Sequence, residues 1–140
     1  MEATKIEIDK LTKWLNIDYW GNYYYIPIGG FKADGVKKWL HTREGSMHIL
    51  EAFWRDNVDF ISIIRTGWVG KPEKELIHVG VDVLYGSSRT STFVKKMRDV
   101  WQALGGGQWN WLPVAQAEAK TLSSAIYKAA INYLEEGDEI

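Results

Sequence analysis

The stretch VDFISIIRTGWVGKPEKELIHVGVDVLYG, residues 58–86, decides the fold class. Two runs of β-branched and aromatic residues flank the polar segment GKPEKE, residues 70–75, which predicts two strands joined by a turn. The second run alternates in polarity, which predicts one buried face and one partly open face. The buried face would carry Ile77, Val79, Val81, Val83 and Tyr85, and the open face His78, Gly80, Asp82 and Leu84.

Two segments before this strand pair also have clear patterns. Apolar spacing in residues 4–16 predicts a helix that Thr4 caps and Asn16 ends, with an inward stripe of Ile8, Leu11, Trp14 and Leu15. Residues 18–30, DYWGNYYYIPIGG, predict a β-hairpin, because Gly21 and Asn22 form a two-residue turn between aromatic runs. Pro27 would then lie at an edge or strand end.

The next two segments differ in clarity. Residues 31–45 carry mixed signals, since glycines at both ends flank a short run that fits a strand or a helical turn. Residues 46–57 predict a helix with Ser46 as its N-cap and an inward stripe of Met47, Leu50, Phe53 and Trp54.

Two helices and a strand are predicted after residue 86. Residues 90–104 have the most regular helical spacing, and the glycines 105–107 would end that helix. Residues 108–112, QWNWL, predict a short strand that Pro113 ends. Residues 121–136 predict a helix capped by Thr121 and stopped by Gly137, with an inward stripe of Leu122, Ala125, Ile126, Ala129 and Tyr133.

The whole chain of 140 residues fits one domain. Hairpin connections imply a mostly antiparallel sheet, and the helices need its faces to bury their apolar stripes. We therefore expect a single α+β domain over residues 1–140, with the sheet packed by three or four helices as a sandwich. An acidic, flexible tail is predicted at about residues 135–140, from Glu135, Glu136, Asp138 and Glu139.

Composition narrows the possible function classes. The net charge is −1, so no global basic field draws the chain to polyanions. Without the four acidic tail residues the chain has 17 basic and 14 acidic residues, so the tail is either a solvated end or a segment that competes with a polyanion for a basic groove. Cysteine is absent, which excludes disulfides and thiol nucleophiles. The N-terminal residues lack the pattern of a signal peptide and no apolar run is long enough to span a membrane, so we expect a soluble, cytoplasmic protein.

The aromatic content is unusual, with 8 Trp, 7 Tyr and 4 Phe. Large rings fill a small core with few side chains, but they also form binding faces. Composition leaves both interpretations open.

A polar cluster on the open face of the predicted sheet is one candidate site. His78 and Asp82 are four residues apart on the same strand, so they point to the same side, and Arg65 would lie on the paired strand. Such a cluster could be catalytic, or it could be cross-strand charge pairing. The histidines His41, His48 and His78 lack the spacing of a metal site, so no metal or cofactor is predicted.

The glycines 105–107 do not form a phosphate-binding loop, because they follow a helix and precede a strand. A better anion-binding candidate is the segment 85–91, which follows a strand and opens a helix. Its candidate ligands are Ser87, Ser88, Arg89 and Thr90. The same residues would equally serve as an ordinary helix cap.

A nucleic-acid interface is a third candidate site. Lys95, Lys96 and Arg98 join Arg89 in a basic cluster. Trp109 and Trp111 are two apart in a predicted strand, so they share one face and could stack on bases. The alternative is that this face is buried against a helix.

The segment AQAEAKTLSSAIYKAAINYLEE, residues 115–136, resembles the C-terminal end of the small phage and prophage proteins grouped as the ABA-sandwich family. The matching positions are Ala117, Ala119, Thr121, Leu122, Ala125, Ile126, Ala129, Ala130 and Ile131. Residues 85–97, YGSSRTSTFVKKM, loosely resemble the entry to the family's penultimate helix. The resemblance implies a layered α/β sandwich from a phage-like genome, without an established activity or catalytic residues.

The first functional hypothesis is therefore a phage-type accessory protein that acts by binding, through an aromatic and partly basic face, to a protein partner or to itself. The second is a binder of single-stranded nucleic acid or nucleotides. The third is an enzyme that uses Arg65, His78 and Asp82.

Overall fold

A computed structural model of the chain describes residues 2–56, 58–68, 70–84 and 111–139. In these residues four helices accompany two three-stranded antiparallel sheets. The predicted class, an α+β domain with antiparallel sheet packed by helices, is confirmed. The predicted helix 90–104, its glycine stop and the anion-binding segment 85–91 lie outside the described residues.

The larger sheet contains β4 (Phe60–Trp68), β5 (Lys71–Leu84) and β6 (Trp111–Ala119), in the order β4-β5-β6. The predicted alternation of β5 is confirmed at four positions, because Val79 and Val81 are fully buried while His78 and Asp82 are partly exposed. Gly80 of the predicted open face is buried, and Ile77 of the predicted buried face is only partly buried. The turn before β5 is shorter than predicted. Most of the polar segment 70–75 belongs to β5, which begins at Lys71.

Strand β6 is longer than predicted and continues through Pro113. Pro113 pairs with Asp82 where the register between β5 and β6 shifts. Because β6 lies at an edge of the sheet, it tolerates a residue without an N–H group. The prediction that Pro113 ends the strand was therefore wrong.

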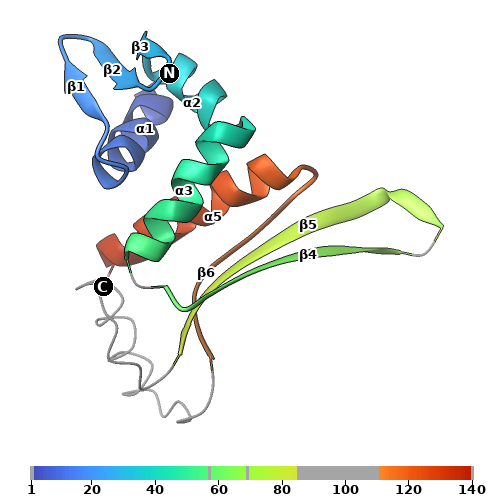
Figure 1. Cartoon of the computed structure of the whole chain (residues 1–140). Helices are drawn as coiled ribbons and strands as arrows, with labels where there is room; N and C mark the ends of the chain where they lie inside the picture. The colour runs from blue at the N-terminus through green and yellow to red at the C-terminus, as the bar shows by residue number, and fades with distance from the viewer. Residues whose placement is uncertain (1, 57, 69, 85–110, 140) are drawn as a thin grey trace.

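Helix α5 (Leu122–Glu139) covers the buried face of the larger sheet (Figure 1). Its cap is as predicted, since the Thr121 hydroxyl accepts a hydrogen bond from the Ser124 N–H at 3.2 Å. Of the predicted stripe, Leu122 is exposed, whereas the others are buried: Ala125, Ile126, Ala129 and Tyr133. Gly137 does not stop the helix, which runs to Glu139.

Helix α1 (Glu2–Trp14) begins before Thr4, so Thr4 is not its cap. Asn16 follows the helix with φ of 59°, a left-handed conformation that fits its predicted role as the end of the helix. Its apolar stripe is buried as predicted at Ile8, Leu11 and Leu15, with Trp14 partly buried.

Residues 31–45, for which the sequence carried mixed signals, mostly belong to helix α2 (Ala33–Leu40) and to the start of helix α3 (Arg43–Arg55). Thr42, not Ser46, caps α3, because its hydroxyl accepts from the Gly45 N–H at 3.3 Å. The helix therefore starts earlier than predicted, and its buried face is different. Of the predicted stripe, Phe53 is buried and Leu50 is partly buried, whereas Met47 and Trp54 are exposed. Ile49 and Ala52 are buried in addition.

The smaller sheet contains β1 (Asp18–Trp20), β2 (Tyr23–Ile26) and β3 (Gly29–Phe31). The predicted hairpin is confirmed, with its turn at Gly21, whose φ is 66°. Pro27 lies in the turn after β2, at a strand end as predicted.

The elements form layers (Figure 1). Helix α5 lies between the larger sheet and the other helices, and the smaller sheet packs outside α1 and α2. Beyond Ala119, where β6 ends, β4 and β5 continue as a two-stranded arm. Among the described helices, none has the length and apolar character needed to cross a membrane.

Candidate functional site

Most of the predicted ligand residues lie outside the described part of the chain. These are Ser87, Ser88, Arg89, Thr90, Lys95, Lys96, Arg98 and Trp109. Trp111 is the first residue of β6 and pairs with Leu84. The anion-binding segment and the basic cluster therefore stay predictions.

The structure brings together only two members of the predicted polar cluster. His78 and Asp82 share the outer face of β5, and burial raises the pKa of Asp82 against the opposing effect of His78. Arg65 pairs with Ile77, so it lies on the opposite face of the sheet. The Arg65 guanidinium is instead 4.0 Å from Glu75, and Nδ1 of His78 is 3.6 Å from Glu118.

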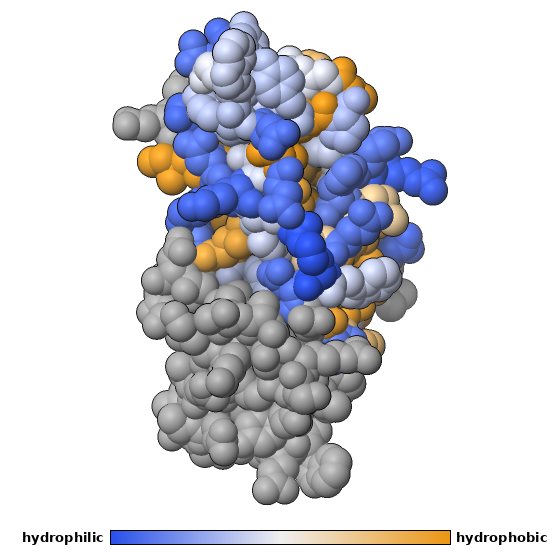
Figure 2. Space-filling view, turned by 60° about the vertical axis from the view of Figure 1, so that its left-hand side comes forward, coloured by the Kyte–Doolittle hydropathy of each residue, from blue (hydrophilic) through white to orange (hydrophobic). Residues whose placement is uncertain are grey.

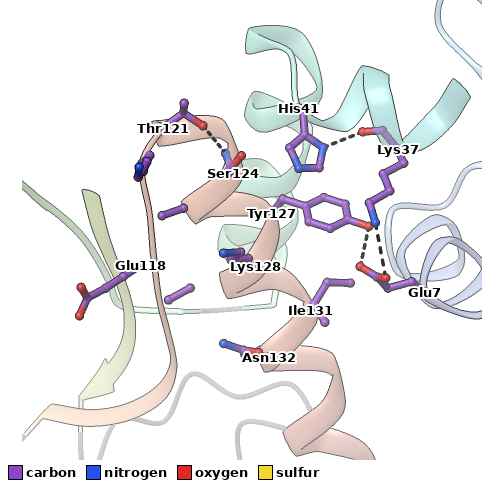
Figure 3. Close-up of a pocket in the computed structure, with 13 residues that line it drawn as sticks. Glu7, Lys37, His41, Glu118, Thr121, Ser124, Tyr127, Lys128, Ile131 and Asn132 are labelled. Atoms are coloured by element: carbon purple, nitrogen blue, oxygen red, sulfur yellow. Dashed lines mark hydrogen bonds and ion pairs between the residues drawn. The ribbon is translucent and has the colours of Figure 1, made fainter. Parts of the chain in front are cut away.

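A cleft of about 570 Å³ is the first candidate site of the described residues (Figure 3). Four elements line it, namely α1, α2, α5 and the end of β6. This cleft was not predicted, because its key residues are far apart in the chain and two of them lie in residues 31–45, for which no element was predicted. These key residues are Glu7, Lys37, His41 and Tyr127.

Tyr127 forms one wall of the cleft. Its hydroxyl donates a hydrogen bond to Oε1 of Glu7 at 2.8 Å, and Nζ of Lys37 is 3.8 Å from Oε2 of the same carboxylate. The Lys37 ammonium also lies 5.6 Å from the centre of the Tyr127 ring, within range of a cation–π contact. Burial, reinforced by the bond to Glu7, raises the pKa of Tyr127, so the phenol keeps its proton at neutral pH.

His41 packs against the other side of this group, with its ring centre 4.4 Å from that of Tyr127. Nδ1 of His41 is 2.7 Å from the carbonyl oxygen of Lys37 (Figure 3). A carbonyl oxygen only accepts, so Nδ1 carries the proton. In the neutral ring, Nε2 is therefore left as a hydrogen-bond acceptor.

The other side of the cleft is formed by α5 and the segment before it. It presents two ammonium groups, two hydroxyls and an amide, from Lys120, Lys128, Thr121, Ser124 and Asn132. The carboxylate of Glu118 points away from the cleft in Figure 3, toward the outer face where it meets His78. The side chains that face the cleft are therefore net positive.

A second feature is the aromatic platform, which we define as Trp20, Tyr23 and Tyr25 on the outer face of the smaller sheet. Their exposed fractions are 77%, 45% and 46%. Trp20 pairs directly with Tyr23, and Tyr25 pairs with Gly30. A Cβ on Gly30 would lie 3.0 Å from Cε1 of Tyr25, so the glycine lets the Tyr25 ring lie across the sheet. Figure 2 shows pale rings gathered at the end of the molecule that this sheet occupies.

A third feature is the outer edge of β4. Ile63 and Ile64 are 50% and 52% exposed. Neighbouring residues of a strand point to opposite faces, so β4 presents apolar side chains on both faces of the sheet. In the described residues β4 pairs only with β5.

No family model, curated protein or solved structure matches the chain. The resemblance of residues 115–136 to the ABA-sandwich family therefore stays a prediction. Functional conclusions rest on the three features above.

Proposed function

We propose that the protein acts by binding, and that it associates with a second copy of itself through the outer edge of β4. A phage-type accessory role, as the resemblance of residues 115–136 implies, agrees with such an assembly function. A cytoplasmic location remains part of this proposal.

The observation that carries the proposal is the joint exposure of Ile63 and Ile64. An edge strand displays backbone N–H and C=O groups that can pair with another strand, and monomeric proteins usually protect such edges with charges, prolines or bulges. The segment from Phe60 to Ile64 has no charged residue and no proline, and the register shift of β4 comes later, between Thr66 and Trp68. Among the described residues, this part of the edge is thus apolar and open to pairing.

A second β4 strand fits this edge by symmetry. Two copies related by a two-fold axis present the same surface to each other, and antiparallel pairing of β4 with β4 would join two three-stranded sheets into one of six strands. Ile63 and Ile64 of each copy would then lie beside β4 of the second copy, one on each face of the joined sheet.

Sedimentation velocity from micromolar to submillimolar concentration tests this proposal. We expect the wild type to reach the mass of a dimer and Ile64→Lys to remain a monomer, because an ammonium on the edge opposes strand pairing. Ile28→Lys is the matched control, since Ile28 is 67% exposed but lies outside β4. A wild type that stays monomeric throughout, or an Ile64→Lys variant that still dimerises, would overturn it.

The aromatic platform favours a second candidate function, the binding of single-stranded nucleic acid. Bases stack on exposed aromatic rings, and three such rings share one face here. Lys32 lines a cavity of about 290 Å³ beside Tyr19, on the opposite face of the same sheet, and offers positive charge for phosphates, whereas Lys5 in that cavity is paired with Asp9.

Titration with a thymidine oligonucleotide at low salt tests this second candidate. We expect quenching of tryptophan fluorescence, and an affinity about 5- to 150-fold lower in Trp20→Ala, from the loss of one stacked base. Trp54→Ala is the matched control, because Trp54 is 66% exposed on α3, outside the platform. If Trp20→Ala and Trp54→Ala bind equally well, the platform is not the binding face.

A further inference from the structure

The cleft beside Tyr127 is separate from the edge of β4 and from the aromatic platform. Its polar groups indicate which kind of ligand it can bind. Its volume of about 570 Å³ is in the range of small-molecule sites. The groups that face it can be sorted into those already paired within the protein and those still able to bind a ligand.

The negative charge that faces the cleft is already neutralised. Glu7 accepts from the Tyr127 hydroxyl with one oxygen and lies 3.8 Å from the Lys37 ammonium with the other. Glu118 lines the cleft but directs its carboxylate to the outer face (Figure 3). A ligand therefore meets no unpaired carboxylate among the described residues of the cleft.

The groups still able to bind are mainly donors. Lys120 and Lys128 have exposed ammonium groups without a partner among the described residues, and the hydroxyl of Ser124 lies on the same wall. Ammonium groups and hydroxyls bind carboxylate or phosphate oxygens through charge-assisted hydrogen bonds. One part of the ligand must therefore be an anionic group.

The remaining groups accept hydrogen bonds. Nε2 of neutral His41 is an acceptor, because Nδ1 holds the ring proton against the Lys37 carbonyl. Asn132 donates from Nδ2 to the Gln116 carbonyl at 2.7 Å, which leaves its Oδ1 as a second acceptor. Hydroxyl groups on the ligand would satisfy both.

From this pairing of donors and acceptors we propose that the cleft binds a small hydroxylated anion, of the size of a sugar phosphate or a hydroxycarboxylate. Lys120 and Lys128 bind its anionic group, and His41 and Asn132 accept from its hydroxyls. Tyr127, held by Glu7 and Lys37 and only 4% exposed, supports the His41 ring at the inner end of the cleft.

Heteronuclear NMR titration of the full chain tests the proposal with four probes: glucose 6-phosphate, citrate, inorganic phosphate and glucose. We expect saturable shifts at His41, Ser124 and Asn132 with glucose 6-phosphate or citrate, and the stronger of the two identifies the anionic group as phosphate or carboxylate. Inorganic phosphate should bind more weakly, and neutral glucose should cause no saturable shift.

Two double variants locate the site. Lys120→Ala with Lys128→Ala should weaken binding of the stronger probe at least about tenfold. Lys13→Ala with Lys38→Ala removes the same charge from exposed positions outside the cleft and should leave the affinity within about twofold. Ile64→Lys should bind normally, which separates this proposal from dimer formation. The absence of saturable shifts with all four probes, or an equal loss in both double variants, would overturn the proposal.

Discussion

Tyr133 of α5 donates a hydrogen bond to Oδ2 of Asp56, at 3.0 Å. The indole N–H of Trp14 donates to the same oxygen at 2.9 Å. The Trp14, Phe53 and Tyr133 rings pack against one another with centres 5.1–5.7 Å apart. One carboxylate at the end of α3 thus ties α1 and α5 to α3.

Removal of this carboxylate should be costly. In Asp56→Ala the Trp14 and Tyr133 donors both lose their acceptor, and we expect a loss of about 2–4 kcal/mol in the free energy of unfolding. Asp56→Asn keeps one acceptor oxygen and should lose less. Urea unfolding measures both, with exposed Glu51→Ala on α3 as control. Equal stability of Asp56→Ala and Glu51→Ala would contradict this role.

Gly45 should tolerate no side chain. A Cβ there would lie 2.2 Å from the Trp39 carbonyl oxygen and 2.5 Å from Cα of Leu40, both backbone atoms of the preceding helix. Gly45→Ala must therefore push α2 and α3 apart, and we expect it to cost about 3 kcal/mol or more. A shift in the urea midpoint smaller than that of an average surface variant would show that the helices can separate easily.

Substitution of Ser46 by alanine should raise the free energy of unfolding. The Ser46 hydroxyl oxygen is buried and has no hydrogen-bond partner within the described residues. Ser46→Ala removes an unpaired polar group without a change in backbone, so we expect it to stabilise the protein by about 1 kcal/mol. A destabilised Ser46→Ala protein, measured by the same unfolding curves, would mean that the hydroxyl has a partner in solution.

Alkaline pH should destabilise the fold through its buried tyrosines. Burial and hydrogen bonds to carboxylates raise the pKa of Tyr24 and of Tyr127, whereas an unfolded phenol loses its proton near pH 10. Above that pH the unfolded state binds fewer protons than the folded state. The contribution of these tyrosines to the free energy of unfolding is fully present below pH 10, and above it each tyrosine lowers that free energy by up to about 1.4 kcal/mol per pH unit. Tyr24→Phe and Tyr127→Phe should each make this fall shallower. If the free energy of unfolding falls equally steeply with pH in the wild type and in both variants, the two tyrosines do not cause the fall.

Acrylamide quenching should distinguish the tryptophans. Among the 8 of the chain, Trp20 and Trp54 are the most exposed of those described, at 77% and 66%, while Trp39 is 6% exposed. Trp20→Phe and Trp54→Phe should each clearly lower the fraction of the tryptophan fluorescence that acrylamide quenches, and Trp39→Phe should not. The opposite ranking would place Trp20 in an interface under the conditions used.

The sequence predicted those elements whose apolar pattern was local and regular. The alternation of β5, the hairpin at Gly21 and the buried stripe of α5 at Ala125 and Ala129 depend on neighbours within a few residues. Errors arose where a tertiary neighbour decides. Pro113 is tolerated because β6 is an edge strand, and the start of α3 depends on how closely Gly45 approaches α2.

The candidate sites were less accessible to prediction. Glu7 and Tyr127 meet across 120 residues of sequence, and no spacing rule connects them. The face on which Arg65 lies depends only on the register between β4 and β5, because a one-residue shift in that register moves a side chain to the other face of the sheet. The hairpin rich in Trp and Tyr was visible in the sequence, but the pairing of Trp20 with Tyr23 is what shows that Trp20 shares the outer face with Tyr23 and Tyr25.

The position of α5 has a consequence for how the protein is made. This helix fills the space between the larger sheet and α1, α2 and α3, yet it is the last of the described elements to leave the ribosome. Until then the nascent chain exposes the faces of α1, α3 and β5 that α5 will cover, so native packing must follow translation of α5. Synthesis and folding of the described elements are thus coupled at α5.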